Sequence, residues 1–423
     1  MEIFILLSFL LLAIASDRAL GQFSIKPAHT CPKTTRTAFE LTHHLMNKYY
    51  NWTSGRLNGG SVWTDANALE TVHTLMLQNK RTDWDGFADN SYLGRHALNT
   101  SSDWQAFTGG YIDDAGWCIL DLWAMADYKT FRSENGVEEY LISAGQLYDK
   151  MSENWDDTCG GGVWWTTDHG YKNAITNELF LTISAQGYLR FGNETYLENA
   201  KKTWAWLEAS GMRNSEGLYN DGLDDSCVNN GETTWTYNQG VLASGLGALW
   251  KATGNRTLLK EAEITLDATI KDMTVNGVLK ESCDSVIETD DPCDIDQQTF
   301  KACMLHSVGL SSDWCIIKGI WTKHLQYYLI FTNEKEKIAK YGPFLGVQSH
   351  AVIKYATNAT DDISNLWYAR DEVGLLAIVM PFVVLIELKL KGGAIYNVKS
   401  LPSGIMAHVA AAQFGGCEGV DST

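Results

Sequence analysis

Residues 117–126 read WCILDLWAMA, a stretch in which only Asp121 is charged. Residues 179–185, LFLTISA, and residues 241–250, VLASGLGALW, have the same apolar character. A helix that is apolar on nearly every side is buried on every side. These three segments therefore predict helices that lie inside the protein and are surrounded by other elements.

A second kind of segment carries its apolar residues on one stripe at helical spacing. In one example the apolar positions are Tyr196, Leu197, Ala200, Trp204 and Leu207. Thr195, with Glu198 three residues later, fits a capping box at the start of this segment. A single stripe predicts a helix that is half exposed.

The two kinds of segment alternate along the chain at intervals of roughly 60 residues, which is typical of stacked helical hairpins. The buried helices are expected to begin near Thr64, Asp113, Ala174, Thr236, Gly319 and Ser403. The half-exposed helices are expected at residues 35–50, 137–154, 195–210, 257–275 and 334–357. An inner ring of helices wrapped by an outer ring satisfies this alternation. We therefore predict an all-α fold, an (α/α)6 barrel that forms a single domain over residues 22–423.

The N-terminal residues 1–21 are interpreted as a signal peptide, with an apolar run at 3–15 and cleavage expected after Gly21. The alternative is a membrane anchor, but the run is shorter than the roughly 20 apolar residues of a spanning helix. We expect no stable membrane insertion. Glycosylation sequons occur at Asn51, Asn99, Asn193, Asn255 and Asn358. Together with nine cysteines, an odd number that leaves at least one unpaired, they favour a secreted glycoprotein, extracellular or in a cell wall.

The formal net charge is −18 and the isoelectric point is near 4.9. An acidic surface repels phosphate backbones, so we expect no nucleic acid partner. The charge fits a neutral substrate such as a polysaccharide, although solubility alone would also explain it. The sequence contains no C-x-x-C and no H-E-x-x-H motif, and we expect no metal site.

The loops that precede the predicted inner helices share a composition rich in glycine, aromatic residues, amides and acids. They comprise residues 59–63, 108–114, 160–165, 169–173 and 233–239. Aromatic rings stack on sugar faces, while amides and carboxylates bind hydroxyl groups. If the inner helices run in one direction, these loops meet at one mouth of the barrel, where we expect the functional site. The alternative is that the aromatic loops only plug the end of the barrel.

Asp113 and Asp114 are the candidate catalytic pair. Adjacent aspartates recur in this chain, and their usual place is a solvated helix start, where acids suit the helix dipole. This pair instead lies between Gly109-Gly110-Tyr111 and the apolar helix that contains Trp117. Burial and mutual repulsion there would raise the pKa of one partner and provide one acid and one base at the same pH. Glycoside hydrolysis requires this division.

At this point the sequence resembles glycoside hydrolase family 76. The motifs that carry the resemblance are YIDDAGW at 111–117, GGGVWW at 160–165, KNA at 172–174 with Asn177 and Phe180, TYNQG at 236–240, and CDID at 293–296 with Phe300 and Lys301. The matches run in order from about Trp63 to Phe414. Each motif is weak alone, but the ordered set is specific.

The resemblance implies an (α/α)6 barrel that cleaves α-1,6-mannan by an endo-acting, configuration-retaining route. This chemistry needs no metal, we expect no cofactor, and a monomer is the default expectation. It implies that Asp113 is the nucleophile and Asp114 the acid and base, with carboxyl groups roughly 5–5.5 Å apart. Candidate stacking surfaces are Trp164, Trp165, Trp235 and Tyr237; candidate hydroxyl-binding residues are Asn177, Asp221, Asn238 and Gln239. Each of these eight could equally be a core or capping residue.

The sequence departs from the family pattern in two places. In the family, the Phe-Lys after the Cys-Asp-x-Asp motif runs directly into Gly-Ile, whereas here residues 302–318 precede Gly319. Similarly, residues 371–392 separate the segment 367–370 from 393–396. We hypothesise that both stretches are translated introns, and the alternative is that they are genuine loop insertions. Sequencing of the transcript distinguishes the two, because spliced messages that retain both segments would rule introns out.

Two other functions remain open. A cell-wall transglycosidase acting on mannan or on glycolipid-anchor glycans would use the same chemistry; a C-terminal lipid-anchor signal is typical of such relatives, and residues 417–423 carry no hydrophobic tail. A non-catalytic mannan-binding protein would keep the aromatic residues and could lose the acids. The intact pair Asp113 and Asp114 favours an enzyme.

Overall fold

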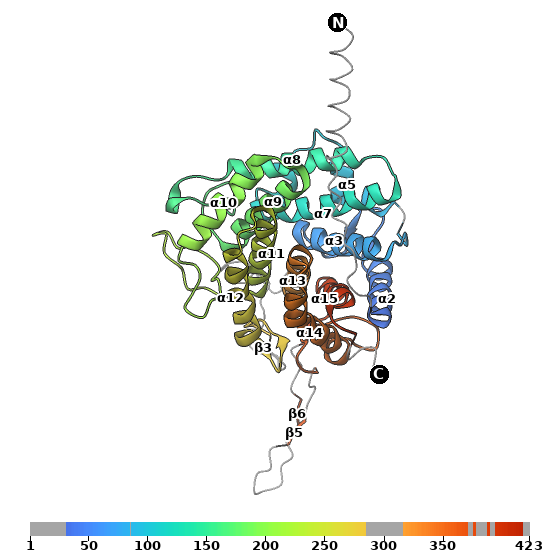
Figure 1. The fold of residues 1–423 in the computed structure, drawn as a ribbon. Coiled ribbons are helices and arrows are strands. Elements are labelled where there is room, and N and C mark those ends of the chain that lie inside the picture. The colour runs from blue at the N-terminus through green and yellow to red at the C-terminus, as the bar shows by residue number, and fades with distance from the viewer. Residues whose placement is uncertain are drawn as a thin grey trace.

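The computed structural model describes residues 31–84, 86–284, 316–370, 375–377, 387–389 and 394–417. The predicted signal peptide, residues 1–21, lies outside these ranges. Within them, the structure is dominated by helices that form two concentric layers (Figure 1).

The inner layer consists of the predicted buried helices. They are α3 (Val62–Asn79), α7 (Ile112–Arg132), α9 (Ala174–Phe191), α11 (Thr236–Thr253), α13 (Ile317–Thr332) and α15 (Ser400–Phe414). Each contacts the next in this order, and α15 returns to contact α3, which closes the ring. Figure 1 shows α11, α13 and α15 side by side. The prediction of an (α/α)6 barrel is confirmed.

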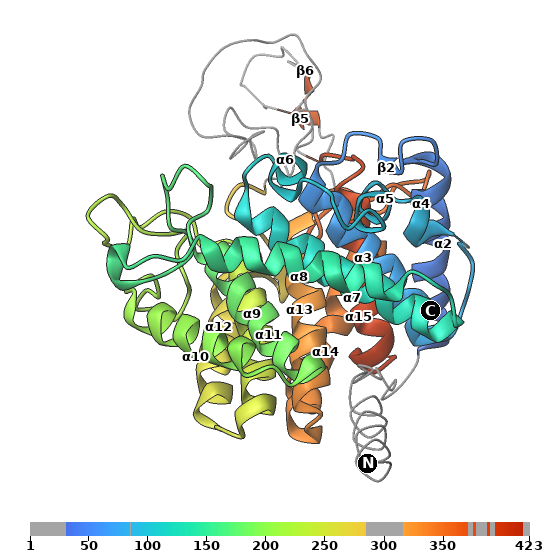
Figure 2. The same cartoon turned by 90° about the horizontal axis from the view of Figure 1, so that it is seen from above.

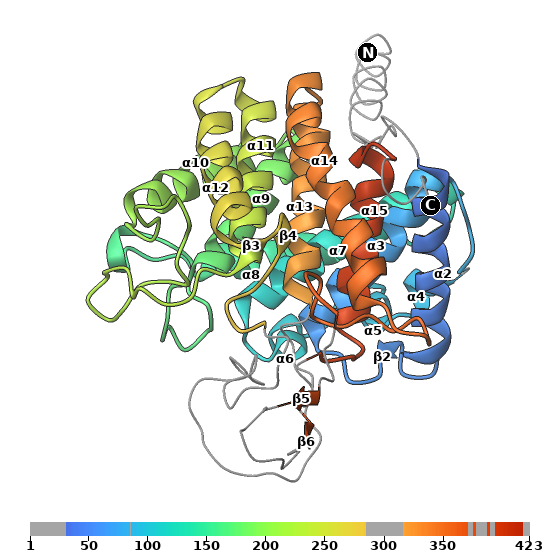
Figure 3. The ribbon, with the colours of Figure 1, turned by 90° about the horizontal axis from the view of Figure 1, so that it is seen from below.

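The outer helices pack on this ring. They are α2 (Pro32–Lys48), α8 (Val137–Glu153), α10 (Glu194–Ala209), α12 (Thr257–Asp272) and α14 (Lys335–Ala351). In the view of Figure 2, α8 extends across the molecule along α7, and Figure 3 shows α12 alongside α11. Between α3 and α7 the outer layer is made of short helices instead of one long helix, namely α4 (Phe87–Asn90), α5 (Tyr92–Ala97) and α6 (Trp104–Thr108).

Because an outer segment returns the chain after each inner helix, the inner helices run in the same direction and their first turns meet at one end of the barrel. Main-chain hydrogen bonds connect these starts to the preceding loops: the N–H of Ile112 donates to the carbonyl of Trp165 at 2.8 Å, and the N–H of Ala174 donates to the carbonyl of Asp221 at 2.7 Å. The loops predicted to surround a functional site are therefore brought together.

The described strands are short antiparallel hairpins between helices. They are β1 (Tyr50–Asn51) with β2 (Arg56–Leu57), β3 (Thr274–Val275) with β4 (Val278–Leu279), and β5 (Leu375–Ala377) with β6 (Glu387–Lys389). In the first hairpin Tyr50 pairs with Leu57 and Asn51 pairs with Arg56. The last hairpin belongs to the second departure from the family pattern.

The predicted capping box at Thr195 and Glu198 is wrong. Helix α10 begins earlier, and its N-cap is Asn193, whose side-chain oxygen accepts the N–H of Thr195 at 3.0 Å. Asparagine caps a helix as well as threonine does. A capping box does occur at the start of α3, where Ser61 and Thr64 bond to each other's backbone.

The interior of the barrel holds a buried ion pair as well as apolar side chains. The Lys323 amino group on α13 contacts the Glu70 carboxylate on α3 and donates to the side-chain oxygen of Asn67 at 2.7 Å. The hydroxyl of Tyr327 donates to the same Glu70 carboxylate. Such a pair is stable inside a protein only when its remaining polar atoms find partners, and here it links two inner helices that are more than two hundred residues apart in sequence.

Cysteines cross-link the structure at two described places. Cys31, just before α2, is bonded to Cys417, just after α15, so the two ends of the described chain are tied together. Cys159 is bonded to Cys227. Cys118 is buried in α7 as a free thiol, in keeping with the odd number of cysteines in the chain.

Most of residues 302–318 and 371–392 lie outside the described ranges. Residues 316–318 are the exception in the first stretch, and all three are buried. Lys318 lies in the first turn of α13, where its amino group contacts Asp284 and the carbonyl of Asn365. If residues 302–318 were spliced out, Lys301 would directly precede Gly319. The start of α13 would then keep a lysine, so the intron hypothesis stays a prediction.

No helix in the described ranges is long and apolar enough to cross a membrane.

Candidate active site

The two candidate catalytic aspartates lie in the first turn of α7, at the mouth of the barrel where the inner helices begin. Both are only partly exposed to solvent. The N–H of Asp114 donates to the side chain of Asp113 at 3.1 Å. Unpaired N–H groups and the helix dipole favour negative charge at this position, while burial opposes it.

Asp113 faces loops that come from distant parts of the chain. Burial raises the pKa of its carboxyl group to about 6, a hydrogen bond from the Trp165 side chain opposes this rise, and the negative charge of Asp221 adds to it. The Trp165 ring also contacts Tyr111, with centroids 5.3 Å apart, and Tyr171, with centroids 6.2 Å apart. The surroundings of Asp113 are therefore aromatic and acidic.

Asp114 has different neighbours. Burial raises the pKa of its carboxyl group well above the usual range, the charge of Asp113 raises it further, and the positive charge of Arg56 lowers it. Arg56 is held in place by Asp65, whose carboxylate accepts from its Nε at 2.9 Å, and by the Tyr92 ring, whose centroid is 5.2 Å away. The positive charge of Arg56 is therefore part of the setting of Asp114.

Asp221 is a third carboxylate at the same place. Its side chain accepts the hydroxyl of Tyr171 at 2.7 Å and a hydrogen bond from the Trp235 side chain, while burial raises its pKa to about 6. The buried Tyr237 is also adjacent, because burial and then the charges of Asp221 and Asp113 raise the pKa of its hydroxyl well above the usual range. Of the predicted binding residues, Trp165, Asp221, Trp235 and Tyr237 thus surround Asp113.

Asn177 and Gln239 use their side-chain amides for bonds within the protein, so their predicted role in binding hydroxyl groups is not supported. Both are fully buried. The Asn177 amide donates to the carbonyls of Val163 and Asn173 and accepts the N–H of Val163 at 2.7 Å. The Gln239 amide accepts the N–H of Tyr219 and donates to the carbonyls of Tyr219 and Trp235. Each amide clamps the loop before its own helix, so its polar atoms are already bonded.

For Trp164 and Asn238 the structure shows packing inside the protein. The Trp164 ring stacks on His169 at a centroid distance of 5.2 Å, and the amino group of Lys172 lies 4.6 Å from its centroid, so loop packing accounts for this ring. Asn238 is fully buried in α11, and neither side-chain polar atom has a hydrogen-bond partner within the described part of the chain. A fully buried amide cannot meet a polymer at the mouth.

Three residues at the site were not among the predicted ones. Arg56 lies in a two-residue strand that carries no motif. Tyr171 is brought next to Asp221 only by folding, because the two residues are in different loops. Tyr111 is the N-cap of α7. Tyr111 is 44% exposed, which is unusual for an aromatic ring beside a buried helix. An exposed aromatic next to two acids is the signal that could have identified it.

A family model for glycosyl hydrolase family 76 matches residues 31–317, about two thirds of the chain. The chain belongs to glycosyl hydrolase family 76. The matched range includes Asp113, Asp114, Trp165, Asp221 and Arg56, so the site lies wholly within the family 76 region.

Curated relatives of this chain are found in fungi. The mannan endo-1,6-alpha-mannosidase DCW1 of Saccharomyces cerevisiae is 30% identical over 301 residues, which cover 66% of this chain and 64% of the relative. The mannan endo-1,6-alpha-mannosidase DFG5 of the same yeast is 27% identical, over 63% of this chain and 58% of the relative. The chain thus matches less than two thirds of the length of these relatives.

Solved family 76 structures share the fold. An α-1,6-mannanase of a Salegentibacter species, an inactive variant with two consecutive aspartates replaced by asparagine and α-1,6-mannotriose bound, gives a TM-score of 0.66 at 19% identity and covers 90% of this chain and 99% of that one. Dfg5 of Chaetomium thermophilum, in complex with glucosamine, gives a TM-score of 0.67 at 18% identity and covers 90% of both chains.

Proposed function

We propose that this family 76 protein is a glycoside hydrolase that cleaves α-1,6-mannosidic bonds within mannan and retains the anomeric configuration. The observation that carries the proposal is the unequal setting of two adjacent aspartates at the barrel mouth. Asp113 faces Trp165 and Asp221, whereas Asp114 faces Arg56. The named activities of the fungal relatives and the inactive double-aspartate variant of the bacterial mannanase support this choice.

In the first step, a carboxylate oxygen of Asp113 attacks C1 of the mannosyl residue and the bond from C1 to the glycosidic oxygen breaks. Asp114 donates its proton to that oxygen, which leaves as the free 6-hydroxyl of the next sugar. In the second step, Asp114 accepts a proton from water, the water oxygen bonds to C1, and Asp113 is released as a carboxylate. Two inversions at C1 give net retention.

The pKa directions suit these roles. The pKa of Asp113 is raised only to about 6, so near neutral pH it is the ionised partner and is available as a nucleophile. The pKa of Asp114 is raised well above the usual range, first by burial and then by the charge of Asp113, so it keeps its proton and can donate it. Two titrating groups with separated pKa values are what acid and nucleophile assignments require.

Incubation with linear α-1,6-mannan tests the proposal. We expect shorter oligomers whose new reducing ends are first formed in the α configuration, as followed by NMR and mass spectrometry. Products longer than the substrate would instead identify a transglycosidase. Binding without any change in chain length would identify a mannan-binding protein, and β-configured reducing ends would show an inverting enzyme.

We also propose that the protein is a secreted glycoprotein. At all five sequons the asparagine side-chain oxygen accepts the N–H of the serine or threonine two residues later; these asparagines are Asn51, Asn99, Asn193, Asn255 and Asn358. All five are exposed or half exposed. The bond uses the carbonyl oxygen and not the nitrogen to which a glycan is attached, so the same local turn suits the modification at each place.

Peptide-N-glycosidase treatment of protein made in a eukaryotic secretory host should therefore lower its mass and convert modified asparagines to aspartates. Thr257→Ala, which destroys only the sequon at Asn255, should remove a single glycan from the mass of the untreated protein. A secreted protein with no mass change on treatment would contradict this proposal.

A further inference from the structure

Two loops bring the neighbours of Asp113 into place. Loop A, residues 154–173, connects α8 to α9 and carries Trp165 and Tyr171. Loop B, residues 210–235, connects α10 to α11 and carries Asp221 and Trp235. Neither loop contains a regular strand or a helix longer than one turn, so other contacts have to fix their conformation.

The loops are joined by their backbones close to Lys172. The N–H of Leu223 donates to the carbonyl of Lys172 at 3.1 Å, and Asn173 forms a bridge with Gly222. These contacts lie beside Asp221, whose carboxylate accepts the hydroxyl of Tyr171. A shift of one loop against the other would therefore alter the acidic side of the site.

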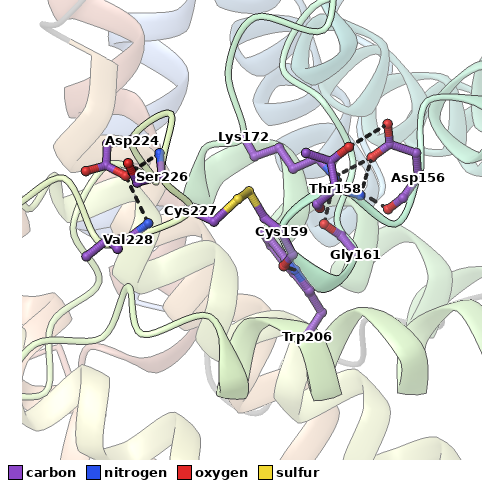
Figure 4. Close-up of a disulfide and its surroundings, with 10 residues drawn as sticks. All are labelled: Asp156, Thr158, Cys159, Gly161, Lys172, Trp206, Asp224, Ser226, Cys227 and Val228. Carbon is purple, nitrogen blue, oxygen red and sulfur yellow. Dashed lines mark hydrogen bonds and ion pairs between the residues drawn. A yellow bond between two sulfur atoms is a disulfide. The ribbon is translucent and has the colours of Figure 1, made fainter.

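A disulfide provides a second, covalent connection. Cys159 of loop A is bonded to Cys227 of loop B, with Cα atoms 5.1 Å apart, and Figure 4 shows the bond spanning the two loops. Both half-cystines have positive φ angles, 59° and 62°. Residues other than glycine adopt this left-handed conformation at a free-energy cost, so surrounding contacts have to maintain it.

Lys172 gathers the first part of loop A around its amino group. Its side chain is buried, and the amino group donates at 2.7 Å to the carboxylate of Asp156 and to the carbonyls of Thr158 and Gly161 (Figure 4). A lysine has three donors, and all three are used here. The turn that contains Cys159 is thus held by hydrogen bonds to the Lys172 amino group.

Helix α10 supports the same turn from outside the barrel. The Trp206 side chain donates to the carbonyl of Cys159 at 3.0 Å (Figure 4). A Cβ atom at Gly162 would lie 2.6 Å from the Trp206 ring, and Gly162 has a φ of 95°, so this position requires glycine. The ring therefore packs directly against the backbone that leads to Trp165.

Trp165 transmits the position of loop A to Asp113. Its N–H donates to the carbonyl of Tyr171 at 2.8 Å, and its carbonyl accepts the N–H of Ile112, the residue before Asp113. Its side chain is hydrogen-bonded to the Asp113 carboxylate. If loop A moves, this hydrogen bond has to lengthen or break.

We propose that the Cys159–Cys227 disulfide and the buried amino group of Lys172 are positioning elements of the catalytic site. They hold loop A against loop B so that the Trp165 side chain stays hydrogen-bonded to Asp113. The disulfide is not among the groups that contact Asp113, so its role is exerted through Trp165. The expected change in kcat rests on the proposed function, whereas the expected change in the surroundings of Asp113 does not depend on it.

The groups that face Asp113 determine what a loss of this support should do. They are Asp114 on its own helix, Trp165 in loop A, Asp221 in loop B and Tyr237 on α11. Among these side chains Trp165 donates a hydrogen bond to the carboxylate, and backbone N–H groups of the first turn of α7 also donate to it, whereas the charge of Asp221 raises its pKa. Loss of its hydrogen bond should raise the pKa of Asp113 above its value of about 6.

The test compares two double variants. Cys159→Ser with Cys227→Ser opens the loop disulfide, and Cys31→Ser with Cys417→Ser opens the disulfide that joins the ends of the described chain. Both lose a covalent cross-link, but only the first pair lies in the loops of the site. Lys172→Met is a third variant that loosens loop A without changing a cysteine.

For the loop variants we expect kcat on an α-1,6-mannan oligosaccharide to fall about 10- to 100-fold, as for small misplacements of a catalytic group. The acidic limb of kcat/KM should move to higher pH. The Cys31 and Cys417 variant should unfold at lower temperature but keep the wild-type kcat and pH limb. Rates are measured well below the unfolding midpoint of each variant, so that partial unfolding does not lower the measured kcat.

Carbon-13 NMR titration of aspartate carboxyl groups supplies a readout that needs no activity, with the Asp113 signal assigned from its absence in Asp113→Asn. A raised pKa of Asp113 in both loop variants supports the positioning role even if wild type proves inactive on mannan, in which case only the proposed function fails. An unchanged pKa of Asp113, with wild type active, overturns the positioning role and leaves the hydrolase intact. If the loop disulfide variant does not fold, Lys172→Met decides by the same titration.

Discussion

Asp113→Asn is expected to lower kcat/KM on linear α-1,6-mannan by about 10⁴-fold or more, which is the scale of losing a covalent nucleophile. The amide is nearly the same size as the carboxylate and can still occupy the first turn of α7, so the fold should persist. What is lost is the oxygen that bonds to C1. The measurement is the initial rate of reducing-end formation at pH 7, together with a thermal melt that verifies folding.

Asp361→Asn is the matched control for this variant. Asp361 also belongs to an adjacent aspartate pair, but it is exposed and lies in a turn after α14, with a left-handed φ of 61° that asparagine tolerates well. Its activity should equal that of wild type. A slow fluorinated mannosyl substrate should leave a covalent mannosyl group on Asp113 of the wild type, and labelling of another residue, or near-wild-type turnover of Asp113→Asn, would refute the assignment.

The barrel could be predicted from the sequence because burial leaves a direct trace in composition. The inner helices α9 and α11 begin at the predicted Ala174 and Thr236, and α7 begins one residue before Asp113. A helix that is enclosed on all sides has no polar face, and this holds without knowledge of its neighbours. The outer layer between α3 and α7 could not be predicted in this way, since the caps at Ser91 and Asp103 divide it into short pieces.

The site was only partly predictable because its contacts join segments that are far apart in sequence. Asn177 and Gln239 have the residue type of a sugar ligand and stand near helix starts beside aromatic loops. The sequence does not specify the direction of an amide, and both point back to clamp Val163 and Tyr219. Arg56 was missed for the opposite reason: nothing local marks a hairpin arginine whose importance comes from the charge of Asp114 on another element.

The same reasoning separates the two aspartates. From sequence they are neighbours with equal claims to either role, and only the resemblance to family 76 assigned them. The structure supplies a physical difference, since the side chain of Trp165 stabilises the charge of Asp113, while the charge of Asp113 disfavours ionisation of Asp114. This asymmetry has a consequence that can be measured on Asp114 alone.

Asp114→Asn is expected to lower kcat/KM on mannan by about 10²- to 10⁴-fold, the usual contribution of a general acid and base. The loss should be much smaller on an aryl α-1,6-mannobioside, because an acidic phenol leaves without being protonated and only the second step still needs the base. Single-turnover release of the phenol from both enzymes isolates the first step. Equal losses on mannan and on the aryl substrate in that experiment would show that Asp114 does not protonate the leaving oxygen.

The pH dependence of Asp114→Asn provides the stricter criterion. In wild type, Asp113 must be ionised, so kcat/KM should be lost as the pH falls through about 6. Asp114 must be protonated, and burial and the charge of Asp113 raise its pKa, so activity should persist at neutral pH and be lost only as the pH rises through that higher value. Asparagine cannot titrate, so the alkaline limb should vanish in the variant. The acidic limb should stay close to its wild-type position near pH 6, because Asp114 is already protonated and uncharged where Asp113 titrates. A variant that keeps the alkaline limb would mean that another group is the acid.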